Sequence, residues 1–218
     1  MKKIIVTSFL LLFAIGTQAQ SLRLNESEKA LVSSGTKKDM MRVLQITNEA
    51  DAKILRGVST DVNLKDESLP LLIGRMLATV KDPANTGVGI AAPQIGINKN
   101  LILIQRFDKP GEPFEALLNP KIRWRSALLR KGAEGCLSIA DKRGDVLRSY
   151  TLEITYYDAD GKFHDEIIEG FTAVIFQHET DHLLGILFTD RLEQQTIPDY
   201  QPLNGEVNFF VEHKQRRN

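Results

Sequence analysis

The chain has 218 residues, which is enough for one domain with a full hydrophobic core. Lysine and arginine together number 28 and are matched by 28 aspartates and glutamates, so the formal net charge is zero. No basic stretch is long enough to follow a phosphate backbone, so nucleic acid is excluded as an expected partner. We expect a single globular unit and, by default, a monomer.

The first 20 residues contain the three parts of a signal peptide. Lys2 and Lys3 form a basic start, residues 4–15 are an apolar stretch, and residues 17–19 are a small-residue cleavage pattern. The apolar stretch is short for a bilayer span, so we expect no transmembrane segment after cleavage. The sequence therefore predicts an exported protein, periplasmic or secreted.

Residues 21–40 are polar and mixed in composition, and we expect a flexible lead-in there, followed by a single catalytic domain at 41–218. Two internal methionines, Met40 and Met41, offer an alternative start. If translation begins at either one, the signal peptide is absent and the protein is cytoplasmic.

Apolar residues at helical spacing predict a helix over 69–80, which ends before Asp82-Pro83. The chain then changes to runs rich in β-branched and aromatic residues. These runs predict strands at Leu101–Gln105, Phe114–Leu118, Leu152–Tyr157 and Phe163–Ile168. The turn-forming residues 158–161 are expected to join the last two strands as a hairpin.

A second helix is predicted at 171–184, and Gly185 is well placed to end it. The sequence shows no internal repeat and no second core. The order of elements favours an α+β fold, in which short mixed or antiparallel sheets surround a C-terminal metal-binding helix.

The run His178-Glu179-Thr180-Asp181-His182 lies inside the second helix. Residues four apart lie on one face of a helix, so both imidazoles can reach a single metal ion with Glu179 beside it. This pattern is typical of metal-dependent hydrolases. A catalytic site of this kind needs a third protein ligand.

Three sources of the third ligand can be considered. The extended protease pattern His-Glu-x-x-His-x-x-Gly-x-x-His fails at its last position, which is Phe188. A downstream carboxylate, Glu206 or Glu212, would make the chain a different kind of metalloprotease. Cys136 is the only cysteine, cannot form an intramolecular disulfide, and is the remaining candidate.

Three motifs, in their order along the chain, closely resemble those of the peptide deformylase family. They are Gly87-Val88-Gly89-Ile90-Ala91-Ala92-Pro93-Gln94, Glu134-Gly135-Cys136-Leu137-Ser138 and Gln177-His178-Glu179-Thr180-Asp181-His182. The resemblance runs from Val43 to Leu192. It implies a reaction of protein biosynthesis: hydrolysis of the formyl group from N-formylmethionyl peptides, with release of formate.

The resemblance implies that Cys136, His178 and His182 hold one divalent metal ion. A thiolate with two imidazoles suits Fe²⁺ or Zn²⁺, and the family favours Fe²⁺. A bound divalent metal lowers the pKa of its water ligand, which makes hydroxide available as the nucleophile. Glu179 is the implied general acid and base.

The resemblance also implies which residues contact the N-formylated peptide. The Gln94 side-chain amide and the Leu137 backbone N–H are the implied donors to the formyl oxygen as it gains negative charge. Val88 and Gly89 lie in a glycine-rich stretch where an extended peptide can pair as an added strand.

Three apolar residues precede the first histidine on the ligand face of the helix. They are expected to form a wall for the substrate's methionine side chain: Phe171, Val174 and Ile175.

Two positions depart from the family pattern. Gly132 replaces a residue that is commonly apolar and faces the side-chain pocket, which bears on selectivity for methionine. Ala140 replaces a proline that follows the cysteine motif. Elsewhere the pattern is kept: Arg148 stands where the family carries an arginine that pairs with the motif aspartate, here Asp181.

A further alternative is a protein that has the deformylase fold but does not catalyse the reaction. In this reading the chain is a catalytically silent module that binds formylated or other peptides. The complete set of metal-ligand and acid–base residues favours the enzyme.

Overall fold

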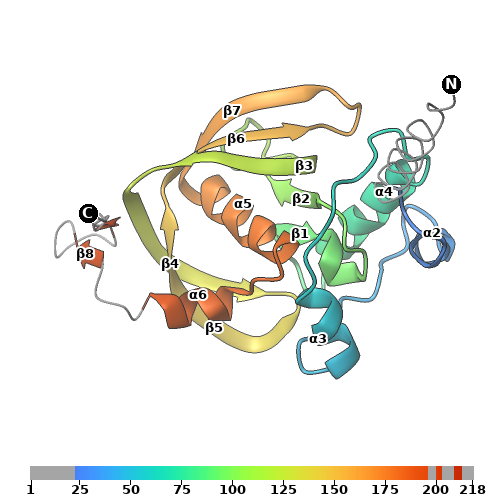
Figure 1. Cartoon of the computed structure of the whole chain (residues 1–218), viewed down its shortest axis with the longest axis horizontal. Coiled ribbons are helices and arrows are strands. Elements are labelled where there is room, and N and C mark those ends of the chain that lie inside the picture. The colour runs from blue at the N-terminus through green and yellow to red at the C-terminus, as the bar shows by residue number, and fades with distance from the viewer. Residues whose placement is uncertain (1–22, 196–199, 203–208, 213–218) are drawn as a thin grey trace, which may run out of the picture.

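The computed structural model describes residues 23–195, 200–202 and 209–212. These residues form two antiparallel sheets, and helix α5 (Gly170–Leu183) lies between them (Figure 1). The predicted α+β class, with sheets around a C-terminal helix, is therefore confirmed. The expected signal peptide at 1–20 lies outside the described residues. Among the described helices, none is both long enough and apolar enough to cross a bilayer.

The larger sheet has five strands in the order β1-β2-β3-β6-β7. They are β1 (Gly89–Ala91), β2 (Leu101–Gln105), β3 (Phe114–Arg125), β6 (Thr151–Tyr157) and β7 (Phe163–Glu169). All four predicted strands are present, and β6 and β7 form the predicted hairpin with Tyr157 opposite Phe163. β3 runs past its predicted end because its second half pairs with β6 while its charged side chains stay in solvent.

The smaller sheet has the order β5-β4-β9-β8. Its strands are β4 (Leu128–Cys136), β5 (Ile139–Ser149), β8 (Tyr200–Pro202) and β9 (Phe209–Glu212). β4 and β5 were not predicted, because glycines and charged residues interrupt their apolar pattern. The strands are also not all short, since β3 has 12 residues and β5 has 11.

Glycines bound the central helix. α5 begins at Gly170, with φ of 64°, and ends before Gly185, with φ of 70°. Both ends lie within one residue of the prediction. The predicted helix at 69–80 is α4 (Leu69–Val80). The remaining helical elements are α2 (Glu26–Ser33), α3 (Glu49–Leu55), the 3₁₀ turn η1 (Ala92–Ile95) and α6 (Phe188–Gln194).

The larger sheet is covered on both faces near β1 and β2. One apolar cluster joins α5 to the sheet and includes Ile102, Ile104, Ile154, Ala173, Ile175 and Phe176. A second cluster joins α4 to the opposite face and includes Leu72, Met76, Val80, Leu101 and Leu103. Burial on both faces favours continuous apolar strands such as β2, and it fixes α5 firmly against the sheet.

The flexible lead-in expected at 21–40 is not what the structure shows for residues 23–40. Asn25 and Glu28 form a capping box that begins α2, which satisfies two backbone donors at the helix start. Val32 is 1% exposed and packs in the same cluster as α4. The polar composition of residues 23–40 gave no signal for α2, a short helix with one buried face.

Arg75 on α4 ties this segment to the rest of the fold. Its guanidinium is buried and donates hydrogen bonds to the backbone carbonyls of Leu31, Val32, Asp39 and Met40. A buried cation needs such acceptors because it has left water. Residues 31–40 are therefore part of the folded unit.

We predict that Gly185→Ala destabilises the protein by about 3 kcal/mol or more, because a left-handed φ and a backbone clash act together. A Cβ at this position would lie 2.3 Å from the Arg56 carbonyl oxygen. Gly111→Ala is the control, since Gly111 also has a positive φ, of 77°, but an added Cβ meets nothing within 4 Å. Urea unfolding measures both changes, and equal losses would contradict the clash.

Candidate metal centre

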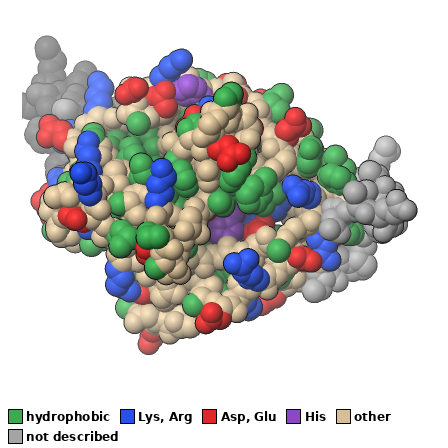
Figure 2. Space-filling view, turned by 180° about the vertical axis from the view of Figure 1, so that it is seen from behind, with side chains coloured by type: hydrophobic (Ala, Val, Ile, Leu, Met, Phe, Trp, Pro, Cys, Tyr) green, Lys and Arg blue, Asp and Glu red, His purple; other side chains and the backbone are tan. Residues whose placement is uncertain are grey.

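The residues predicted as metal ligands meet where α5 passes the end of β4. His178 and His182 lie one turn apart on α5, and Cys136 is the last residue of β4. Figure 2 shows a histidine side chain at the floor of a hollow, with apolar side chains gathered beside it. The His178 side chain is 11% exposed, whereas His182 is buried, so solvent reaches the site at His178.

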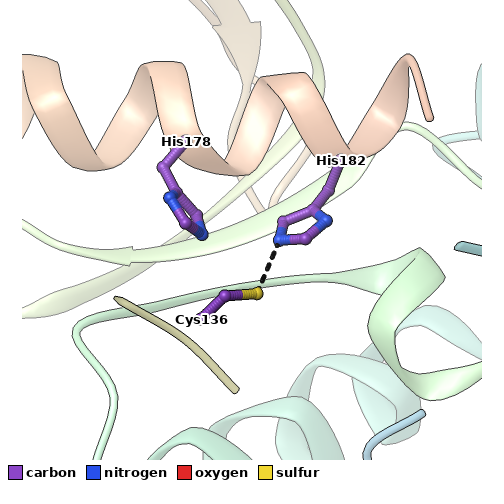
Figure 3. Close-up of side chains that lie close together, drawn as sticks. All are labelled: Cys136, His178 and His182. Atoms are coloured by element: carbon purple, nitrogen blue, oxygen red, sulfur yellow. Dashed lines mark hydrogen bonds between the residues drawn. The ribbon is translucent and has the colours of Figure 1, made fainter. Parts of the chain in front are cut away.

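The three side chains point towards one another (Figure 3). His182 Nε2 lies 3.2 Å from Cys136 Sγ, and one donor atom from each residue lies within 4.8 Å of the other two. Both rings project from one side of α5, as a four-residue spacing requires. One cation between them would contact a sulfur and two nitrogens.

The donor chemistry fits a divalent metal. Burial by itself raises the pKa of the Cys136 thiol, but His182 and His178 outweigh burial and lower that pKa to about 5. The sulfur is therefore a thiolate near neutral pH, which is the form that binds metals. A thiolate with two imidazoles is a donor set for Zn²⁺ or Fe²⁺.

Glu134 fixes the orientation of His178. Glu134 Oε2 lies 2.8 Å from His178 Nδ1, so the other ring nitrogen faces Cys136. Glu134 and Cys136 lie two residues apart on β4 and share one face of the strand. A carboxylate behind a metal-binding histidine sets its tautomer and raises its basicity. The sequence analysis gave Glu134 no role, although its spacing from Cys136 on a strand was the available signal.

Arg148 lies behind Glu134 and links it to α5. Its Nε and Nη2 donate to the two Glu134 carboxylate oxygens at 2.7 and 2.9 Å. Its Nη1 donates to Asp181 Oδ2 at 2.6 Å, so the predicted pair is confirmed. Arg191 on α6, which the sequence analysis missed, adds two hydrogen bonds to Asp181 at 2.9 and 2.5 Å.

These contacts keep Glu134 ionised. Burial raises the pKa of its carboxyl, but hydrogen bonds from Arg148 and His178 outweigh burial and lower it from 4.5 to about 2. The folded pKa is thus below the unfolded value. Ionised Glu134 therefore stabilises the fold above about pH 4.5, and this contribution is lost as the pH falls towards 2.

Gln94 is held in one orientation beside the cysteine. Its Oε1 accepts a hydrogen bond from the Ala91 N–H at 2.8 Å. Its Nε2 therefore points to Cys136 Sγ at 3.5 Å and to Ser138 Oγ at 3.3 Å. The side chain is 2% exposed, so the amide donor is fixed before any ligand arrives.

Leu137 lies in the tight connection between β4 and β5. Gln45 Nε2 donates to the Leu137 carbonyl at 2.9 Å, and the Ile46 N–H donates to the Ser138 carbonyl at 3.0 Å. The segment before α3 thus holds the backbone next to Cys136 in place. The sequence analysis missed Gln45, because a contact across about 90 residues leaves no local pattern.

Glu179 is buried next to the three donors, at 4% exposure. Burial raises the pKa of its carboxyl from 4.5 to about 7, against the opposing effect of His178 and His182. Its Oε2 has no hydrogen-bond partner among the described residues. A Cβ on Gly89 would lie 2.5 Å from Glu179 Oε1, so the glycine leaves room for this carboxyl.

The residues expected to bind the peptide separate into two groups. Phe171 is 44% exposed and its ring lies 5.1 Å from that of Phe107, while Val88 and Val174 are half-buried. Ile175 is only 3% exposed and packs in the core, which leaves it little surface for a substrate. Helix geometry gives the reason, since Val174 and Ile175 lie about 100° apart around the axis, and only Ile175 of the two belongs to the buried cluster against the larger sheet.

Of the two carboxylates considered as third ligands, only the backbone of Glu212 is described. Glu206 lies outside the described residues. Glu212 is the last residue of β9, which pairs with the beginning of β4 through Val211 and Leu128. Leu128 is eight residues from Cys136, or about 26 Å along the strand. The described structure thus places Cys136 beside the two histidines.

Comparison with known proteins gives one consistent result. The sequence model of the family described as polypeptide deformylase matches residues 40–197. A peptide deformylase of Synechocystis is 40% identical over 142 residues, covering 65% of this chain and 75% of that protein. A peptide deformylase of Leptospira biflexa is 37% identical over 169 residues, covering 73% of this chain and 91% of that protein.

Solved structures show the same relationship. The Met-Ala-Ser-bound crystal structure of a class I type b peptide deformylase from Acinetobacter baumannii superposes with a TM-score of 0.63 at 34% identity, covering 71% of this chain and 99% of that one. A peptide deformylase from Synechococcus elongatus in complex with actinonin gives a TM-score of 0.61 at 36% identity, covering 69% of this chain and 78% of that one.

We predict that Glu134→Gln weakens Zn²⁺ binding by about 10- to 100-fold, because His178 loses the charged partner that raises its basicity. Competition against a chelator of known affinity measures the change. Glu153→Gln on β6, in the other sheet, is the control and should leave the affinity unaltered. An unchanged affinity in Glu134→Gln would show that Glu134 does not support a metal ligand.

Proposed function

Because this chain belongs to the polypeptide deformylase family, we propose that it hydrolyses the formyl group of N-formylmethionyl peptides and releases formate. Family membership makes it a metal-dependent hydrolase. The single observation that supports this reaction in this chain is the convergence of Cys136, His178 and His182 beside the buried carboxyl of Glu179.

Cys136, His178 and His182 are the proposed ligands of one divalent metal, Fe²⁺ or Zn²⁺. When bound, the metal would supply Lewis-acid polarisation and lower the pKa of a water molecule. Ferrous iron and a free thiolate are both open to oxidation, so the metal that is retained depends on the compartment.

Glu179 is the proposed general base and acid. Its raised pKa suits a group that accepts a proton from water and then passes it to the departing amine near neutral pH. Its unpartnered Oε2 is free to accept that proton. Gly89 has no side chain and so leaves the space that this carboxyl occupies.

Gln94 Nε2 and the Leu137 backbone N–H are the proposed donors to the formyl oxygen as negative charge develops. The Ala91 N–H holds the Gln94 amide in position, and Gln45 holds the Leu137 backbone. Donors that are already oriented stabilise the transition state without a cost of reorganisation.

The peptide itself is proposed to bind along β1. β1 is an edge strand of the larger sheet, so an extended chain can add to it through Val88 and Gly89. The exposed side chain of Phe171 and the half-buried side chain of Val174, both at the start of α5, then lie beside the first residue of the substrate.

We predict that the purified protein, loaded anaerobically with Fe²⁺ or Zn²⁺, releases formate from formyl-Met-Ala-Ser and no acetate from acetyl-Met-Ala-Ser. Glu179→Gln should lower kcat by at least about 100-fold with metal content unchanged, because it removes proton transfer and no ligand. Coupled formate detection and metal analysis measure the two quantities.

The silent-module alternative gives a different result in the same assay. A metal-loaded protein that binds formyl-Met-Ala-Ser without releasing formate would support that alternative and contradict the enzyme. Full activity in Glu179→Gln would remove the proposed acid–base role while leaving the metal site intact.

The proposed location is outside the cytoplasm, on the basis of the signal-peptide pattern at 1–20. The packing of the following residues argues against an internal start. A chain that began at Met40 or Met41 would lack Val32, which is buried, and the carbonyls that accept hydrogen bonds from Arg75.

We predict that a chain of residues 41–218 is less stable than a chain of residues 21–218 by at least about 3 kcal/mol, because it leaves the buried Arg75 guanidinium without its acceptors. Denaturant unfolding measures the difference. A chain of residues 23–218 is the control and should match the longer one. Equal stability of all three chains would support the internal start.

A further inference from the structure

Side chains of α5 and β4 meet at two successive positions. His178 meets Glu134 at 2.8 Å and, one turn later, His182 meets Cys136 at 3.2 Å. Four residues of helix advance about 6.0 Å and two residues of strand advance about 6.6 Å, so the spacings along the helix and the strand match over this step.

Extrapolated one step back, the same spacing sets Val174 on α5 opposite Gly132 on β4. Gly132 lies two residues before Glu134 and therefore on the same face of the strand. Its partner across the β4–β5 pair is Val146, which is 1% exposed and packs with the residues of α6. The face of Gly132 is thus the inner face, which carries the metal site.

Nothing in the described structure fills the position of the missing side chain. A Cβ built on Gly132 meets no heavy atom within 4 Å. Its φ is not positive, so the backbone does not require glycine either. Glycine at this position therefore leaves open space beside β4, and neither packing nor backbone conformation requires it.

The opposite side of this space is apolar. Val174 is half-buried one turn before His178, and the Phe171 ring is 44% exposed against Phe107. The hollow in Figure 2 carries apolar side chains beside its histidine. A substrate side chain that enters here would meet apolar groups on the helix and open space on the strand.

We infer that Gly132 widens the pocket for the first side chain of the substrate. The enzyme therefore accepts N-formyl peptides that begin with a broad aromatic residue, such as phenylalanine, as well as those that begin with methionine. This inference rests on the proposed function and concerns its substrate range.

The test compares Gly132→Ile with Ala133→Ile, whose side chain lies on the opposite, exposed face of the same strand. The substrates are formyl-Met-Ala-Ser and formyl-Phe-Ala-Ser. The unaltered enzyme should show kcat/KM values for the two peptides within about 10-fold of each other. Gly132→Ile should lower the phenylalanine value by at least about 10-fold and the methionine value by no more than about 3-fold, a difference that pocket sterics can supply.

A second readout does not depend on catalysis. Isothermal titration calorimetry with the tripeptides Met-Ala-Ser and Phe-Ala-Ser should show the same selective loss of Phe-Ala-Ser binding in Gly132→Ile and no change in Ala133→Ile. Comparable binding of both tripeptides to the unaltered protein supports the wide pocket even if no formate is released, in which case the proposed function alone fails.

Two results would overturn the inference. One is an unaltered enzyme that releases formate from the methionine peptide but discriminates against phenylalanine by more than about 100-fold, as a closed pocket would. The other is an equal change in the methionine-to-phenylalanine ratio in Gly132→Ile and Ala133→Ile.

Discussion

The juxtaposition of α5 and β4 is the constraint on which the site depends. Cys136 is separated from the two histidines by more than 40 residues, and it meets them only because the inner face of β4 lies against one face of α5. The buried guanidinium of Arg148 joins the two elements by binding Glu134 and Asp181 together. Burying these charges is costly, and their mutual hydrogen bonds offset the cost while fixing the register of helix and strand.

Because of this arrangement, neighbouring positions along α5 and β4 have different roles in the site. At the end of β4 the arrangement brings sulfur and imidazole together, and one step back it places the Glu134 carboxylate behind a ligand. Gly132, two residues before Glu134 on the same strand, leaves an open position. The same helix carries Glu179 next to the ligands, where burial sets its pKa near neutrality. The proposed ligand geometry, proton transfer and substrate range thus all depend on the contact between α5 and β4.

Sequence patterns predicted the elements whose signals are local. The spacing of His178 and His182 placed both rings on one helix face, and apolar runs located β2, β6 and β7. The role of Cys136 came from the resemblance to a family, because spacing alone left three candidate ligands. The C-terminal end of α5 was predictable because Gly185 takes a left-handed conformation that other residues adopt only with strain.

Features that depend on distant contacts could not be predicted. β4 and β5 are stabilised by pairing with each other rather than by apolar alternation, so their glycines and charges concealed them. Gln45 contacts the Leu137 carbonyl from far away in the sequence, and Ile175 lies on the core side of its helix.

The most direct test of the central claim is X-ray absorption at the zinc edge of the Zn²⁺-loaded protein. One sulfur at about 2.3 Å and two nitrogens at about 2.0 Å are predicted, and a spectrum with nitrogen and oxygen ligands alone would contradict the account.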